Sequence, residues 1–138
     1  MANGVYASVT EGVSMRPLFR THRDMVILAP PSGKLQKYDV ALYRVGEKYV
    51  LHRVVGYDKE NDLYLIRGDN TYSLERVKPS AVIAKLIAFN RKGKRYEISD
   101  FSYRLYSKVW VAIYPLRHFF KKIEWFLRGL LRKLFKRK

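Results

Sequence analysis

Short apolar segments separated by turn-forming residues run through the first hundred positions. Some of them alternate apolar and polar positions and others are continuous apolar runs, and both patterns are typical of short strands. Gly46-Glu47 and the stretch 91–94 lie between pairs of such segments, so we expect a hairpin at each. Many short strands with regular turns predict a mainly β, antiparallel fold. The expected strands are residues 5–9, 25–29, 39–45, 49–55, 63–67, 81–90 and 95–98.

The period of the apolar pattern changes near Ser99. From there apolar residues recur every four positions, as on one face of a helix, until Pro115, which should break or kink it. Beyond Pro115 the apolar residues fill an arc of roughly 140° on a helix. Those before Pro115 are Phe101, Leu105, Val109 and Ile113, and those after it are Leu116, Phe119, Phe120, Ile123, Phe126, Leu127, Leu130, Leu131 and Leu134.

The sequence therefore predicts two parts, a β-rich core over residues 1–99 and an amphipathic helical tail over 100–138, α+β overall. Basic residues lie opposite the apolar arc of the tail, on the side that also carries Trp125 and Gly129. The pattern gives no reason for Trp125 on that side. The basic residues of this side are Lys121, Lys122, Arg128, Arg132, Lys133 and Lys136.

Charge is concentrated in the same tail. The chain of 138 residues has 28 Lys and Arg against 12 Asp and Glu, a net charge of +16. Residues 1–100 hold 17 basic and 11 acidic residues, or +6, whereas residues 101–138 hold 11 basic and one acidic, or +10. Such an excess of positive charge indicates an anionic partner. Because most of the excess lies in the tail, we expect the tail rather than the core to bind that partner.

A helix with a basic side and a Phe- and Leu-rich side has the character needed to lie in the headgroup plane of a membrane. Packing of the apolar arc on the β core or on a second copy is the alternative. The aromatics lie mainly on the apolar side and make no stacking platform between basic residues, so no nucleic acid is expected. No stretch approaches the roughly 18 apolar residues of a spanning helix, and no signal peptide pattern begins the chain. We therefore expect a cytoplasmic protein peripherally associated with a membrane.

The absence of cysteine excludes disulfides, iron–sulfur clusters and thiolate zinc sites. The three histidines, His22, His52 and His118, are too widely spaced to indicate a metal site, so neither metal nor cofactor is expected.

Ser14 is the most informative residue for chemistry. It lies between an expected strand and a turn limited by Pro17, where a serine can be exposed as a nucleophile with its backbone N–H facing an oxyanion. A serine needs a base, and His52 within a strand is a candidate, with Asp69 as the carboxylate. By themselves the three residues are more often turn formers or satisfied polar groups than a catalytic triad.

Several motifs occur in order: Gly12-Val13-Ser14-Met15-Arg16-Pro17, Asp39-Val40, His52-Arg53-Val54-Val55 and Gly68-Asp69-Asn70. In this order they resemble the type I signal peptidase family and the related repressor autoproteases of the bacterial SOS response. The later segment 82–87 and the basic hairpin after it are similar to the end of the family's core. The resemblance covers roughly residues 5–98 and implies a signal-peptidase-like antiparallel β core.

The resemblance also implies roles. Ser14 matches the nucleophile, with its backbone N–H serving the oxyanion. His52 stands where many bacterial members have a lysine base and where archaeal and endoplasmic-reticulum members have histidine. Asp69 matches the aspartate that would orient or electrostatically support His52. In the family an extended substrate lies between two strands, and the residues expected along it here are Val9, Thr10, Glu11, Gly12, Met15, Val50 and Leu51.

The chain departs from the family pattern at four places. Only 13 residues precede Ser14, where members usually carry a membrane helix. Gly12 offers no side-chain oxyanion donor. The common Gly-Asp after the serine turn is Arg23-Asp24. A second aspartate downstream of Gly-Asp-Asn in the endoplasmic-reticulum branch is absent, and Glu75 occupies that neighbourhood.

The sequence thus predicts a serine endopeptidase that cleaves a leader or signal-like peptide at or near a membrane surface. The expected partners are a peptide or protein substrate and an anionic membrane, and a homo-oligomer or a membrane protein partner stays open. The alternatives are a catalytically inert or autoproteolytic peptide-binding β-module, and a basic protein that binds nucleic acid or a membrane surface.

Overall fold

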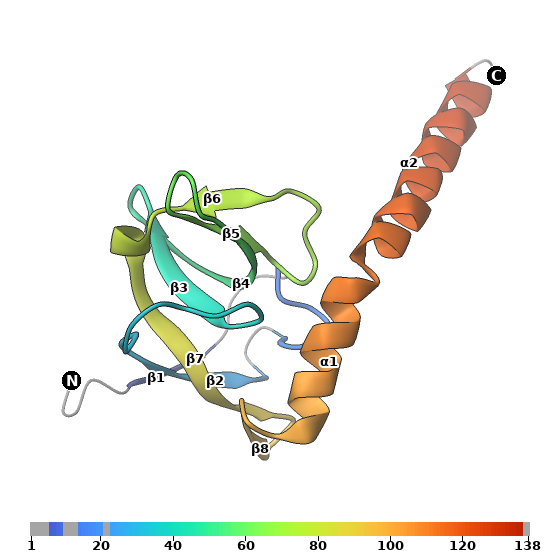
Figure 1. Cartoon of the computed structure of the whole chain (residues 1–138). Coiled ribbons are helices and arrows are strands. Elements are labelled where there is room, and N and C mark those ends of the chain that lie inside the picture. Colours follow the sequence, from blue (N-terminus) through green and yellow to red (C-terminus); the bar gives the residue numbers. More distant parts are fainter. Residues whose placement is uncertain (1–5, 10–13, 21–22, 137–138) are drawn as a thin grey trace.

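The computed structural model describes residues 6–9, 14–20 and 23–136, the first of these ranges by its backbone alone. In this part of the chain an antiparallel sheet is followed by two helices, which confirms the predicted mainly β fold with a helical C-terminal part (Figure 1). The elements are β1 (Tyr6–Val9), β2 (Met25–Ala29), β3 (Val40–Val45), β4 (Lys48–Asp58), β5 (Leu63–Arg67), β6 (Glu75–Val77), the 3₁₀ helix η2 (Pro79–Ala81), β7 (Val82–Arg91), β8 (Lys94–Glu97), α1 (Phe101–Ala112) and α2 (Tyr114–Lys136).

The strands form one sheet in the order β1-β2-β7-β3-β4-β5-β6, with β8 paired to β7. The long strand β7 joins the two halves because it pairs with both β2 and β3. The register is interrupted in β2, β3 and β4. Such irregularities bend and twist strands, and Figure 1 shows a strongly curved sheet.

The alternating pattern of β3 divides the interior into two clusters. Val40 belongs to one cluster with Phe89, whereas Ala41 and Tyr43 belong to the other with Ile66. Successive side chains of a strand point to opposite faces, so a single strand supplies both clusters. The sheet is therefore buried on both faces where β3 passes through it.

Both predicted hairpins are present. Gly46 follows β3 with a φ of 61°, and Lys92 and Gly93 join β7 to β8 with φ values of 54° and 80°. Residues that tolerate positive φ are what tight hairpins require. The sequence pattern missed the short strand β6, whose three residues include only one buried side chain, that of Val77.

The two predicted helices are present, on either side of Pro115. α1 ends at Ala112 and α2 begins at Tyr114, so that Pro115 lies in the first turn of the second helix. Proline is tolerated there because the N–H groups of a first turn have no hydrogen-bond partner within the helix. α1 rests on the sheet through Tyr103, which belongs to the same cluster as Phe89. Phe101, by contrast, is 77% exposed.

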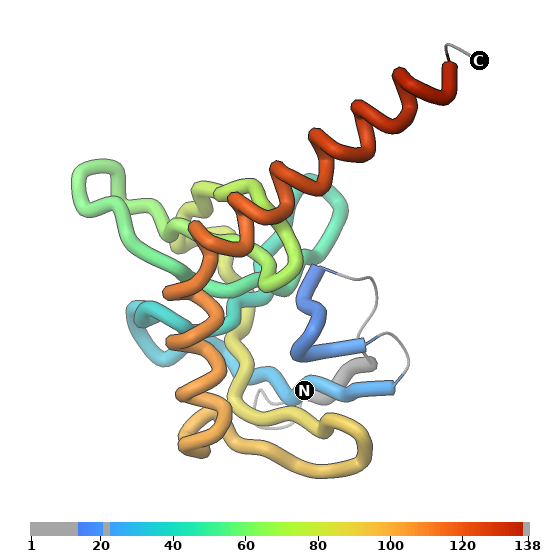
Figure 2. The backbone as a smooth tube through the Cα atoms, turned by 90° about the vertical axis from the view of Figure 1, so that its right-hand side faces the viewer, coloured from blue at the N-terminus to red at the C-terminus, as the bar shows by residue number. Residues whose placement is uncertain are grey.

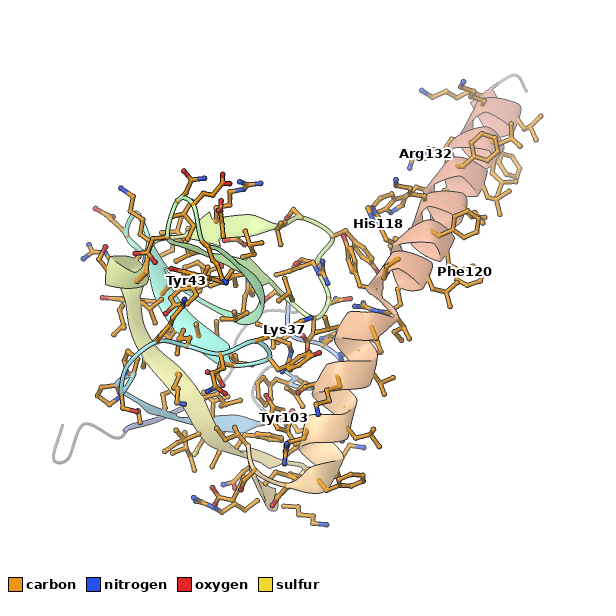
Figure 3. All side chains as sticks on the ribbon, viewed as in Figure 1. Lys37, Tyr43, Tyr103, His118, Phe120 and Arg132 are labelled. Carbon is orange, nitrogen blue, oxygen red and sulfur yellow. The ribbon has the colours of Figure 1, made fainter. Side chains whose placement is uncertain are left out.

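The apolar arc of α2 is exposed in the same way, and α2 extends away from the sheet (Figures 1 and 2). In Figure 3 Phe120 points away from the sheet, while His118 and Arg132 lie on the other side of the helix. Packing of the arc on the β core is therefore not what the structure shows. Within the described ranges, no helix has the length and apolar character needed to cross a membrane.

Candidate active site

Ser14 lies in a turn, described from this residue onward, that carries Met15 and Leu18 into the core. The turn is tied to the loop after β5, because the Ser14 carbonyl accepts the backbone N–H of Asn70 at 2.7 Å. The next residue, Met15, is buried and its sulfur lies 3.4 Å from the backbone nitrogen of Asp69. Two of the motifs found in the sequence, 54 positions apart at that contact, therefore meet in space.

His52 lies on β4 opposite Ala41 of β3 and is 6% exposed. A Cβ atom placed on Gly68 would lie 2.7 Å from the Ser14 carbonyl oxygen and 3.0 Å from Nε2 of His52. Such distances are shorter than side chains tolerate, so only glycine fits between the serine turn and the imidazole. Gly68 thus lies between the main chain of Ser14 and the Nε2 edge of His52.

The other ring nitrogen of His52, Nδ1, is held by two groups. It lies 3.2 Å from the Tyr43 hydroxyl and 3.2 Å from Oε1 of Glu75. The Tyr43 hydroxyl donates to Oε2 of Glu75 at 2.6 Å, so its own oxygen is free only to accept. Both neighbours therefore accept from Nδ1–H, which leaves Nε2 of a neutral His52 as the proton acceptor on the Gly68 side.

Electrostatics favour that neutral form. Burial lowers the pKa of His52 below its usual value, and the charges of Glu75 and Asp69 oppose this shift without cancelling it. Burial and the bond to Glu75 raise the pKa of Tyr43, which keeps its hydroxyl protonated as a donor. At neutral pH the imidazole is consequently poised to take a proton.

Asp69 lies near this group and does not touch His52. Its carboxylate is buried against Arg53, whose Nε and Nη2 donate to Oδ1 and Oδ2 at 2.8 and 2.9 Å. Burial works against the charge of Arg53, but the Asp69 carboxylate outweighs it, and the pKa of Arg53 is raised. The expected orienting contact on His52 comes from Glu75 instead, and Asp69 acts on His52 only through its charge.

Glu75 reaches His52 through the register of three strands. On one face of the sheet, Val54 of β4 is opposite Ile66 of β5, and Ile66 is opposite Glu75 of β6. His52 lies two positions before Val54, on the same face. The sequence placed Glu75 only in the neighbourhood of a missing aspartate, because the strand that carries it was not predicted.

The residues expected along the substrate fall into two groups. Thr10, Glu11 and Gly12 lie outside the described residues, and Val9 is described only as the end of β1, where it pairs with Met25. The others are described: Met15 is buried, and Val50 and Leu51 are half-buried on β4.

Of the basic residues expected at a membrane surface, Lys121 and Arg128 both pair with Glu124. The remaining four, Lys122, Arg132, Lys133 and Lys136, are exposed on α2. Trp125, which the pattern left without a reason, stacks edge-on against Tyr72 with ring centres 5.9 Å apart. The side of α2 that meets the loop after β5 is therefore the one opposite its apolar arc.

Comparison with models of known protein families, with curated proteins and with solved structures finds no match to this chain. Among the residues that the structure describes, no cluster of histidine and acidic side chains could hold a metal ion.

Proposed function

We propose that this protein is a serine endopeptidase in which Ser14 is the nucleophile, His52 the general base and Glu75 the carboxylate that orients His52. The observation that carries the proposal is the position of Gly68, against both the Ser14 carbonyl and Nε2 of His52. A nucleophile beside a base, with the base held by a third group, is the arrangement that acyl transfer to serine needs.

In the proposed reaction the Ser14 hydroxyl attacks the scissile carbonyl carbon while Nε2 of His52 takes its proton. The positive charge that forms on the imidazole is stabilised by Glu75 through Nδ1 and, at longer range, by Asp69. The backbone N–H of Ser14 supports the oxyanion. His52 then gives the proton to the leaving amine, and water hydrolyses the acyl-enzyme with His52 again as base.

The substrate we propose is an extended peptide of the leader or signal-like class. β4 pairs with β3 along residues 48–53, but its described pairing with β5 begins only at Arg53. The opposite edge of Val50 and Leu51 therefore has no strand partner among the described residues. An extended peptide can add to such an edge by backbone hydrogen bonds, next to His52.

We further propose that the outer side of α1 and α2 contacts an anionic membrane surface. Large apolar side chains are exposed along both helices, from Phe101 to Phe135, and basic residues border them on α2. Contiguous apolar surface of this kind is typical of an interface. A second copy would bring two strongly basic helices together, whereas anionic lipid headgroups complement their charge.

The experiment is reaction of the full-length protein with a fluorophosphonate probe, combined with mass spectrometry of the labelled peptide. We expect labelling at Ser14, its loss in Ser14→Ala, and a strong reduction in His52→Ala. Cleavage of leader-like peptides should likewise be lost in Ser14→Ala and strongly reduced in His52→Ala. The cleavage rate of the double variant should be scarcely lower than that of either single variant, because the two residues act as a unit. Full proteolysis by purified Ser14→Ala protein would rule out Ser14 as the nucleophile. Absence of both labelling and cleavage in the parent protein would favour an inert peptide-binding module.

A further inference from the structure

The loop after β5, residues 68–72, lies between the candidate active site and the two helices. On one side Gly68 and Asn70 contact Ser14 and His52, as described above. On the other side the loop meets α1 and the beginning of α2. The loop therefore touches both the nucleophile turn and the helices.

Four hydrogen bonds described between the helices and this loop run in one direction, from side-chain donors on the helices to acceptors on the loop. The carboxylate of Asp69 accepts the Tyr106 hydroxyl at 2.7 Å. The backbone carbonyl of the same residue accepts Trp110 Nε1–H at 2.8 Å and Arg117 Nη1–H at 3.1 Å. Asp69 is thus bound through both its side chain and its main chain by three residues of the C-terminal helices.

The donors themselves are held by their neighbours. The Tyr106 and Trp110 rings stack with centres 5.8 Å apart, and the Arg117 guanidinium lies 4.0 Å from the centre of the Trp110 ring. Burial and the charge of Asp69 raise the pKa of Tyr106, so its hydroxyl stays a donor. Stacked aromatic and guanidinium groups restrict one another's rotamers, and their hydrogen bonds therefore fix the loop in one place.

Tyr72, at the far end of the loop, is held in the same manner by α2. The Tyr114 hydroxyl donates to the Tyr72 carbonyl at 3.2 Å. The Tyr72 ring contacts those of Tyr114, His118 and Trp125 at centre distances of 6.1, 5.4 and 5.9 Å. Both parts of the loop are consequently anchored on helices that begin at Phe101 and at Tyr114, far later in the sequence.

We propose that Tyr106, Trp110 and Arg117 are positioning residues for the active site, and that α1 with the first part of α2 is a clamp on the loop 68–72. Through Asp69 they hold Gly68 against His52 and hold the Asn70 N–H on the Ser14 carbonyl. The helices thus serve the chemistry through their polar side, while their apolar side is left for another contact. The catalytic part of this inference rests on the proposed peptidase function, whereas the clamp itself does not.

The test uses full-length variants that remove one donor each and keep the ring. Tyr106→Phe removes the hydroxyl on the Asp69 carboxylate, and Trp110→Phe removes the N–H on its carbonyl. The matched control is Tyr96→Phe, since Tyr96 stacks on Phe89 of the sheet, away from the loop. Circular dichroism confirms that each variant is folded before further measurement.

The first measurement is hydrogen exchange of the Asn70 amide, which needs no activity. Loss of one hydrogen bond should speed its exchange roughly three- to tenfold, and the double variant should exceed both single ones. The control should match the parent protein. Unchanged exchange in the double variant would overturn the clamp, whatever the enzyme does.

The second measurement is the kinetics of cleavage of a soluble leader-like peptide. Because the helices bind the loop and not the peptide, the variants should lower kcat by a similar factor while KM stays near its original value. Faster exchange with unchanged kcat would overturn the positioning role. If the parent protein neither cleaves peptide nor reacts with the fluorophosphonate at Ser14, the proposed function fails, and the exchange experiment still decides the clamp.

Discussion

Oε1 of Glu75 lies 3.2 Å from Nδ1 of His52, and Tyr43 bridges the two residues. If His52 is the base, Glu75→Gln should lower kcat roughly a hundredfold or more, because an amide can stabilise neither the tautomer nor the imidazolium in the same way. Glu97→Gln is the control, since Glu97 belongs to an exposed pair with Arg95. Equal kinetics for the two variants would remove Glu75 from the mechanism.

The pH profile gives a second test of the same pair. Since burial holds the pKa of His52 below its usual value near 6.5, activity should fall only as the pH drops below that region, and should be flat at neutral pH and above. The charge of Glu75 raises the pKa of His52, so its removal in Glu75→Gln should move the acid limb to still lower pH. Steady-state kcat/KM between pH 4 and 8 measures both profiles. An acid limb that moves to higher pH in Glu75→Gln would contradict the role of Glu75.

Gly68→Ala tests the close approach of Ser14 and His52. The added Cβ would lie 2.7 Å from the Ser14 carbonyl and 3.0 Å from His52 Nε2, so the serine turn and the imidazole must separate. We expect loss of most activity and of fluorophosphonate labelling, with some loss of stability. Gly129→Ala is the matched control, because nothing lies within 4 Å of its added Cβ, and it should stabilise α2 by about 1 kcal/mol.

The buried pair of Arg53 and Asp69 should be decisive for stability. Asp69→Ala leaves the guanidinium of Arg53 buried without its carboxylate, and removing one partner of such a pair costs about 3–5 kcal/mol. Urea unfolding measures the loss of free energy. Arg95→Ala, which breaks an exposed pair, should change the free energy of unfolding little. A small effect of Asp69→Ala would show that the interior around Arg53 admits water.

Contact with a membrane can be checked with sedimentation of lipid vesicles. Full-length protein should bind vesicles that contain anionic lipid at low salt, and binding should weaken as salt screens the basic residues of α2. Phe120→Ser with Phe126→Ser should weaken binding roughly tenfold or more, because each ring loses apolar contact with lipid. Ile83→Ser, at an exposed apolar site on β7, serves as the control. Dimerisation that survives high salt, without vesicle binding, would favour a second copy as the occupant.

The sequence by itself determined most of the strands and both helices, although it missed β6 and placed the ends of some strands differently. The alternation of Val40, Ala41 and Tyr43 is a property of one strand, and the turn at Gly46 depends on residues next to it, so local patterns suffice. The same holds for the helices on either side of Pro115. The ordered motifs also pointed to Ser14 and His52 as candidates, and in the structure Gly68 lies against both the Ser14 carbonyl and the His52 ring.

Tertiary structure alone decided which side chains meet. Glu75 reaches His52 only through the register of β4, β5 and β6. Asp69 meets Arg53 because Arg67, two residues earlier, pairs with Arg53, and Tyr106 of α1 also donates to Asp69. The apolar period of the helices suggested which side should be buried, yet the side that meets the loop carries Trp125 and is polar. The spacing of apolar residues along a helix identifies its apolar side. It does not identify the surface that packs against that side, because that surface is formed by residues far away in the sequence.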